Sequence, residues 1–187
     1  MSPIGHLITA VSASTALMRL KDVSWSEGMA SLPISILSNQ PIEIDSEGGL
    51  TLLSLGIIVG ARGPDRLELP RFNYKTKIRR SLIPHRTLTH WPVFWFVLTF
   101  ASCLFFAIAQ DALLRAITSV GIGFCASSWL HLAMDILTPA GIPLRTPFGK
   151  RTSLNLYKTS SLGEWLCILV FVFLTQSLAS LHFIFFM

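Results

Sequence analysis

The chain has 187 residues, of which 51% are hydrophobic and 13% are charged, and its mean hydropathy is +0.59. Because a soluble domain carries roughly one-quarter charged residues, this composition excludes an ordinary soluble domain and indicates a single membrane-embedded domain covering residues 1–187. The net charge of +5 does not indicate direct binding of nucleic acid, since in a membrane protein the positions of the basic residues along the chain carry the information.

Five apolar segments follow one another along the chain: 3–18, 48–61, 91–109, 116–137 and 165–187. About 20 apolar residues span the roughly 30 Å hydrocarbon core of a bilayer, so the last three are predicted to cross it. The first two are shorter, and they either cross at an angle, thin the bilayer or enter it only half-way. We therefore predict an all-α fold, a polytopic membrane helical bundle with about four to five membrane segments.

The basic residues predict how this bundle is oriented. Residues 62–86 hold eight of the fifteen basic residues, and residues 145–158 hold four more. If all five segments cross, these two regions share a side, and the positive-inside rule assigns that side to the cytoplasm. We expect a multi-pass membrane protein with cytoplasmic loops at 62–90 and 138–161.

Ionisable residues gather at the same predicted membrane face, although the orientation was derived from Lys and Arg alone. They stand at the cytoplasmic ends of the segments: His6, Asp65, Glu68, His85, His90, His131, Asp135 and Glu164. A shared site is the simplest cause of this coincidence. The three cysteines, in contrast, lie inside apolar segments with no metal-binding spacing, and we interpret them as buried hydrophobes.

The spacing of these residues supports a site. His131 and Asp135 are four apart and share one helical face, so they can offer a nitrogen and a carboxylate to one cation. In a soluble protein a helix-capping Asp bonded to a core His would explain this pair, but ionisable groups in membrane helices are usually functional. Asp65 and Glu68 follow a Gly-Pro break, where an ordinary acidic pair at a helix start is the alternative. In PHRTLTHWP, Pro92 suits the first turn of a helix, which leaves the two histidines of the motif unexplained by capping.

The sequence resembles the YdjM-type family of LexA-regulated inner-membrane proteins, which are described as metal-dependent hydrolases. The resemblance rests on GHLITA, GARGPD, HRTLTH, the block HLAMDILTPAGIPLRTPFGKR and the step TSSLGEW, which together cover most of the chain. The family often continues its PD with a second Asp and a His, whereas this chain reads PDRLELP and offers Glu68. The resemblance implies a metal-dependent hydrolase that is a multi-pass protein of the bacterial inner (cytoplasmic) membrane.

A mixed shell of imidazole and carboxylate suits a divalent metal, best Zn²⁺, with Mn²⁺ or Fe²⁺ as alternatives. We predict five metal ligands: His6, Asp65, His90, His131 and Asp135. This number exceeds the three protein ligands of a usual catalytic zinc, so the prediction leaves open two ions or residues that only orient ligands. His85 and Glu68 are candidates for ligand or general base, and Arg86 for holding an anionic oxygen such as that of a phosphate.

A site at the headgroup layer favours a lipid or a lipid-linked ester or phosphoester as substrate, with membrane lipid as the expected partner. Two alternatives belong to other classes of protein. A metal-ion transporter would carry its ionisable residues near mid-membrane and often an internal repeat, and neither feature is visible. A non-catalytic protein would bind anionic lipid or a cytoplasmic partner through the basic segment 71–80, which can equally be a loop that only sets the topology.

Overall fold

The computed structural model describes residues 1–19, 46–68, 70–73, 78–81 and 86–186. The described chain is mostly helical, as predicted, and its helices are α1 (Pro3–Arg19), α3 (Ser46–Gly60), α4 (Gly63–Arg66), the 3-10 helix η3 (Leu88–His90), α5 (Pro92–Ile108), α6 (Ala112–Ile136) and α7 (Leu162–Phe186). Two small antiparallel hairpins, which the sequence analysis did not anticipate, pair β1 (Pro70–Asn73) with β2 (Ile78–Ser81) and β3 (Ile142–Pro143) with β4 (Arg151–Thr152). His85 and most of the stretch between the first two predicted segments, residues 20–45, lie outside the described residues.

Two helices in the described part of the chain are long and apolar enough to cross a bilayer, namely Leu113–Ile136 of α6 and Leu162–Ser180 of α7. Shorter apolar helices occupy Gly49–Gly60 and Pro92–Ile108. The 17 residues of α5 correspond to roughly 26 Å at 1.5 Å per residue, a little less than the hydrocarbon thickness. The remaining predicted crossings stay predictions.

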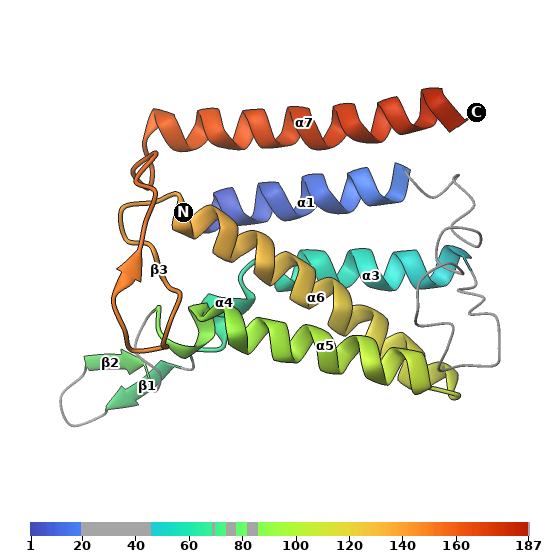
Figure 1. Ribbon diagram of the computed structural model, residues 1–187, viewed down its shortest axis with the longest axis horizontal. Helices are drawn as coiled ribbons and strands as arrows, with labels where there is room; N and C mark the ends of the chain where they lie inside the picture. Colours follow the sequence, from blue (N-terminus) through green and yellow to red (C-terminus); the bar gives the residue numbers. More distant parts are fainter. Residues whose placement is uncertain (20–45, 69, 74–77, 82–85, 187) are drawn as a thin grey trace.

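The long helices lie side by side, and each runs in the direction opposite to the long helix before it in the chain, so that the neighbours α1 and α7 are parallel (Figure 1). The start of α1, the end of α6 and the start of α7 gather at the end of the bundle where α4 also lies, and α6 passes diagonally between α3 and α5. Asp111 begins α6 as its N-cap by accepting a hydrogen bond from the Leu114 amide at 3.1 Å, which explains why the helix starts before the predicted residue 116. Pro92 occupies the first turn of α5, as the sequence predicted, and Trp91 stands at the N-cap position without a capping bond from its side chain.

Helices α3 and α6 pack with their backbones in close approach. A Cβ on Gly56 would lie 2.2 Å from the Val120 carbonyl oxygen, and one on Gly123 would lie 2.0 Å from the Leu53 carbonyl oxygen. Glycine is therefore required at both positions, in the manner of small residues at membrane helix crossings. The approach brings the carbonyl of Ala61, just beyond α3, to the side chain of His131 on α6.

Candidate metal centre

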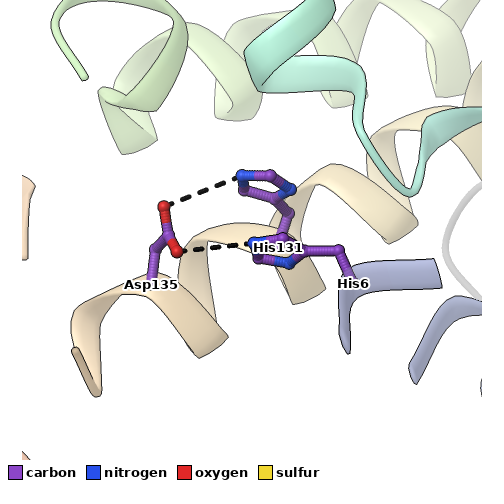
Figure 2. Close-up of side chains that lie close together, drawn as sticks. All are labelled: His6, His131 and Asp135. Carbon is purple, nitrogen blue, oxygen red and sulfur yellow. Dashed lines mark ion pairs between the residues drawn. The ribbon is translucent and has the colours of Figure 1, made fainter. Parts of the chain in front are cut away.

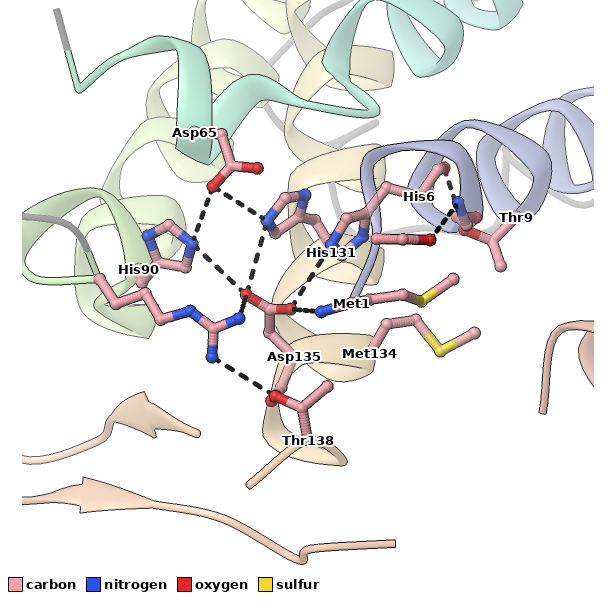
Figure 3. Close-up of polar contacts among 12 residues, drawn as sticks. Met1, His6, Thr9, Asp65, His90, His131, Met134, Asp135 and Thr138 are labelled. Atoms are coloured by element: carbon pink, nitrogen blue, oxygen red, sulfur yellow. Dashed lines mark hydrogen bonds and ion pairs between the residues drawn. The ribbon is translucent and has the colours of Figure 1, made fainter. Parts of the chain in front are cut away.

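Four elements supply the five predicted ligands to one place at the gathered end of the bundle (Figure 3). His6 comes from α1, Asp65 from α4 and His90 from η3, while His131 and Asp135 lie in the last turns of α6. The side chains are all buried except that of Asp65, which is 27% exposed. The cluster is therefore open to its surroundings on the Asp65 side.

The hydrogen bond to His131 determines which of its nitrogens is available. Its Nδ1 lies 3.0 Å from the carbonyl oxygen of Ala61, and because a carbonyl only accepts, Nδ1 must carry the proton. In the neutral ring Nε2 then presents a lone pair. It has no hydrogen-bond partner within the described chain, and it lies 3.8 Å from Asp65 Oδ1 and 3.7 Å from Asp135 Oδ2. Three acceptor atoms thus face one another, an arrangement that a cation stabilises.

The ring of His90, like that of His131, has polar contacts at Nδ1 and turns its Nε2 toward the carboxylates. Its Nδ1 lies 3.4 Å from Glu68 Oε1 and 3.2 Å from Thr89 Oγ1. Its Nε2 lies 3.5 Å from Asp65 Oδ1 and 3.5 Å from Asp135 Oδ2. Because Glu68 contacts Nδ1 and the converging atom is Nε2, Glu68 stands behind the imidazole and not among the converging atoms. A carboxylate at the far nitrogen of a ligating histidine is the usual device that fixes its ring and tautomer.

The converging donor atoms have the dimensions of a metal site. Asp65 Oδ1, His90 Nε2, His131 Nε2 and Asp135 Oδ2 form a ring whose neighbouring members are 3.5 to 3.8 Å apart. The donor atoms of a tetrahedral zinc site, with bonds of 2.0–2.1 Å, are separated by roughly 3.4 Å. Shifts of a few tenths of an ångström would therefore let these residues hold one ion, and the nitrogen and oxygen donors suit Zn²⁺.

His6 and His131 lie on the same side of Asp135, and each faces a different oxygen of its carboxylate (Figure 2). Its ring stacks on that of His131 with centroids 3.6 Å apart, and its Nε2 lies 3.4 Å from Asp135 Oδ1. The α-ammonium group of Met1 lies 2.6 Å from the same oxygen. Donor atoms of His6, His131 and Asp135 form a second possible cation group, but His131 can give its Nε2 to only one ion. The geometry favours His6 as a residue that orients Asp135.

Arg86 also contacts Asp135, and does so from a strained backbone. Its φ of 58° is uncommon for a residue with a side chain, and its amide donates to Glu68 Oε1 at 2.9 Å. The guanidinium lies 3.0 Å from Asp135 Oδ2 and donates to the Gly141 carbonyl oxygen at 3.1 Å. In the structure Arg86 therefore holds Asp135 against the loop after α6, and its predicted contact with a substrate oxygen remains a prediction.

Glu164 lies apart from the converging atoms and holds helix ends together. It accepts hydrogen bonds from the Ser2 amide at 2.7 Å, the Ser2 hydroxyl at 2.5 Å and the Ser160 amide at 2.5 Å. Through these bonds the start of α7 fixes the start of α1, which carries His6. The sequence marked Glu164 as part of the cluster, and the structure gives it a capping role.

The electrostatics of the residues outside the long helices show that the cluster attracts positive charge. Burial alone would raise the pKa of Asp65, but the hydrogen bond to His90 and the neighbouring imidazoles lower that pKa to about 2. Burial alone would lower the pKa of His90, but hydrogen bonds to Asp135 and Asp65 raise it. Without a metal the carboxylates thus favour a proton on His90, the place that a metal cation would take.

The sequence analysis missed the residues that act through their backbone or through short polar side chains. Ala61 contributes a carbonyl to His131, and Thr89 contributes a carbonyl that accepts a hydrogen bond from Trp95 Nε1 at 2.6 Å. Thr89 lies inside the HRTLTH motif, so its position next to His90 was a usable signal. The role of Ala61 follows from the α3–α6 packing, and no local pattern indicates it.

Fold and site together define a helical membrane protein with a buried cluster of histidines and carboxylates at one end of its bundle. Compared with models of protein families, the whole chain, residues 1–187, matches the YdjM inner membrane protein family. The chain belongs to this family, which confirms the resemblance read from its motifs. The comparisons with curated proteins and with solved structures found no match.

Proposed function

We propose that this protein is a membrane-embedded, metal-dependent hydrolase whose site opens at the cytoplasmic face of the inner membrane. One observation carries the proposal: the Nε2 lone pair of His131, fixed by the bond from Nδ1 to Ala61, faces two carboxylates in a buried place. Buried acceptors facing each other are costly without a cation between them. The Arg86 guanidinium and the Met1 ammonium contact Asp135, but His131 Nε2 has no hydrogen-bond donor of its own within the described residues.

His90, His131 and Asp135 are the proposed ligands, because all three are buried and their donor atoms converge. Three protein ligands are typical of catalytic zinc, which keeps a position open for water or substrate. A bound Zn²⁺ would supply two things: it lowers the pKa of water from 15.7 toward about 7, and it polarises an ester or phosphoryl oxygen. Glu68 and His6 act behind these ligands, on His90 and on Asp135.

Asp65 is the proposed general base. It is the least buried member of the cluster. Its Oδ1 lies 3.5 Å from His90 Nε2 and 3.8 Å from His131 Nε2. That position is the open side, where substrate and water enter. Asp65 Oδ1 would take the proton from the attacking water, as a base within hydrogen-bond reach can do.

The proposed substrate is a lipid or a lipid-linked ester or phosphoester. This proposal uses the predicted topology, in which all five long helices cross and the gathered end of the bundle faces the cytoplasm. The alternating helix directions and the basic segments support that topology (Figure 1). A centre at the ends of membrane helices would meet the headgroup level of a lipid, where its ester and phosphoester bonds lie.

Paired variants test the proposal. Asp65→Asn is expected to keep bound metal and to lose hydrolysis of ester and phosphoester lipids by a factor of roughly 10²–10⁴, as loss of a general base does. His131→Ala is expected to lose both metal and hydrolysis. If Asp65→Asn hydrolyses these lipids as fast as the unaltered protein, the role of Asp65 is wrong. If metal-free protein hydrolyses them at the full rate, the metal-dependent mechanism is wrong.

A further inference from the structure

The segment 144–162 exposes large apolar side chains between the two helices that are long enough to cross the bilayer. The exposed side chains are Leu144, Phe148, Leu154, Leu156 and Leu162, and Phe148 is 75% exposed. Single exposed leucines are ordinary on a protein surface, but a succession of them in one short connection marks an interaction surface. Their position relative to the bilayer indicates what covers them.

Hydrogen bonds hold part of this segment at the level of the last turn of α6. The Leu154 amide donates to the Ile136 carbonyl at 2.8 Å, and the Leu156 amide donates to the Leu137 carbonyl at 2.8 Å. The Tyr157 hydroxyl donates to the carbonyl of Met134, further inside the helix, at 3.0 Å. The chain therefore folds back along the end of α6 instead of extending away from it. Exposed Leu154 and Leu156 lie beside the end of this helix, which is long enough to cross the bilayer.

The start of α7 marks the same level. Leu162 begins the helix and Trp165 is exposed in its first turn. Tryptophan is enriched where membrane helices pass through the interface, because its ring is apolar and its N–H is polar. The β3–β4 hairpin lies at the end of the bundle where α1 and α7 start (Figure 1), so the segment stays at this end.

The polar residues of the segment carry charge of one sign. Arg145, Lys150 and Lys158 are exposed, and residues 136–163 contain no Asp or Glu. Exposed basic side chains among exposed apolar ones are the pattern of elements that lie in the plane of an anionic membrane. In such elements the apolar groups enter the acyl boundary, and the basic groups reach the phosphates.

We infer that the segment 144–162 is an in-plane membrane anchor that binds anionic phospholipid headgroups. Leu154, Leu156 and Phe148 contact the acyl boundary, and Arg145 and its basic neighbours contact phosphate oxygens. This anchor is separate from the metal centre and does not depend on the protein being an enzyme.

The depth of the segment can be measured in nanodiscs of phosphatidylcholine and phosphatidylglycerol. A nitroxide on Leu156→Cys or Phe148→Cys, with the three native cysteines replaced by alanine, is expected to collide more with oxygen than with an aqueous nickel complex. The reference for lipid exposure is a nitroxide on Phe96→Cys, an exposed residue of α5. If the labels at both loop positions are as accessible to nickel as a free nitroxide, the segment lies in water and the inference is overturned.

The choice of lipid is measured by energy transfer from a fluorophore on Phe148→Cys to headgroup-labelled phosphatidylglycerol or phosphatidylcholine. Each basic residue near the surface strengthens binding to anionic lipid by roughly fivefold, so Arg145→Gln should lower the local enrichment of phosphatidylglycerol by about that factor. Arg19→Gln, an exposed arginine at the other end of the bundle, should leave it unchanged. Equal transfer to both lipids in the unaltered protein would contradict the inference.

Discussion

Replacing Glu68 with glutamine removes a charge behind the proposed metal ligand His90 while keeping its size. Glu68 Oε1 lies 3.4 Å from His90 Nδ1 and accepts from the Arg86 amide at 2.9 Å and the Thr89 hydroxyl at 3.3 Å. The amide oxygen of glutamine can still accept a hydrogen bond, so the fold should persist. What is lost is the charge-assisted contact that fixes the His90 ring.

The expected result for Glu68→Gln is a loss of metal affinity by roughly 10–100-fold, or about 1.4–2.8 kcal/mol, as for other partners of ligating histidines. A charge-assisted hydrogen bond of about 1.5–3 kcal/mol gives the same range. The assay is competition with a zinc-binding dye on detergent-purified protein.

Glu164→Gln is the matched control, because it also removes a buried carboxylate with three hydrogen-bond donors. It should lower thermal stability and leave metal affinity within about twofold, since a capping contact acts on the helix ends and not on a ligand. An unchanged metal affinity in Glu68→Gln, or an equal loss in both variants, would refute the assignment of Glu68 as the residue that positions His90.

Further predictions concern packing and metal removal. Gly123→Ala should destabilise the protein by about 1–3 kcal/mol in thermal unfolding, because the new Cβ would lie 2.0 Å from the Leu53 carbonyl oxygen, whereas Gly121→Ala, with 3.4 Å to its nearest neighbour, should be tolerated. Trp95→Phe removes the hydrogen bond to the Thr89 carbonyl, so it should lower the free energy of unfolding by about 1 kcal/mol and weaken metal binding. An unchanged midpoint of thermal unfolding would contradict this. Chelation should lower the stability of the metal-loaded protein by about 2.7 kcal/mol when free metal had stood at 100 times its dissociation constant, and no shift would argue against a bound ion.

The sequence predicted the helices well because membrane segments are long apolar runs, and each predicted segment overlaps a helix of the structure. The spacing of His131 and Asp135 was equally readable, since four residues on a helix bring side chains to one face. The basic residues in the loops predicted the topology, and this topology placed His90 at the same membrane face as His131 and Asp135. These features depend on composition and local geometry, which a single sequence contains.

Other parts of the site depend on tertiary packing and were not readable. Ala61 acts through its carbonyl, and its place beside His131 results from the glycine contact between α3 and α6. The left-handed backbone of Arg86, which directs its guanidinium to Asp135, has no signal in the motif HRTLTH. The β3–β4 hairpin likewise forms from pairs too short for any strand pattern.

The most direct test of the metal centre is the amount of metal per folded protein. Detergent-purified protein that has been loaded with Zn²⁺ and dialysed should contain a stoichiometric amount of zinc in elemental mass spectrometry. The His131→Ala and Asp135→Ala variants should lose this zinc and keep the circular dichroism of a helical protein. Arg19→Ala, at the other end of α1, should retain it. Equal metal content in the unaltered protein and in both cluster variants, or a folded and fully active protein without metal, would contradict the account.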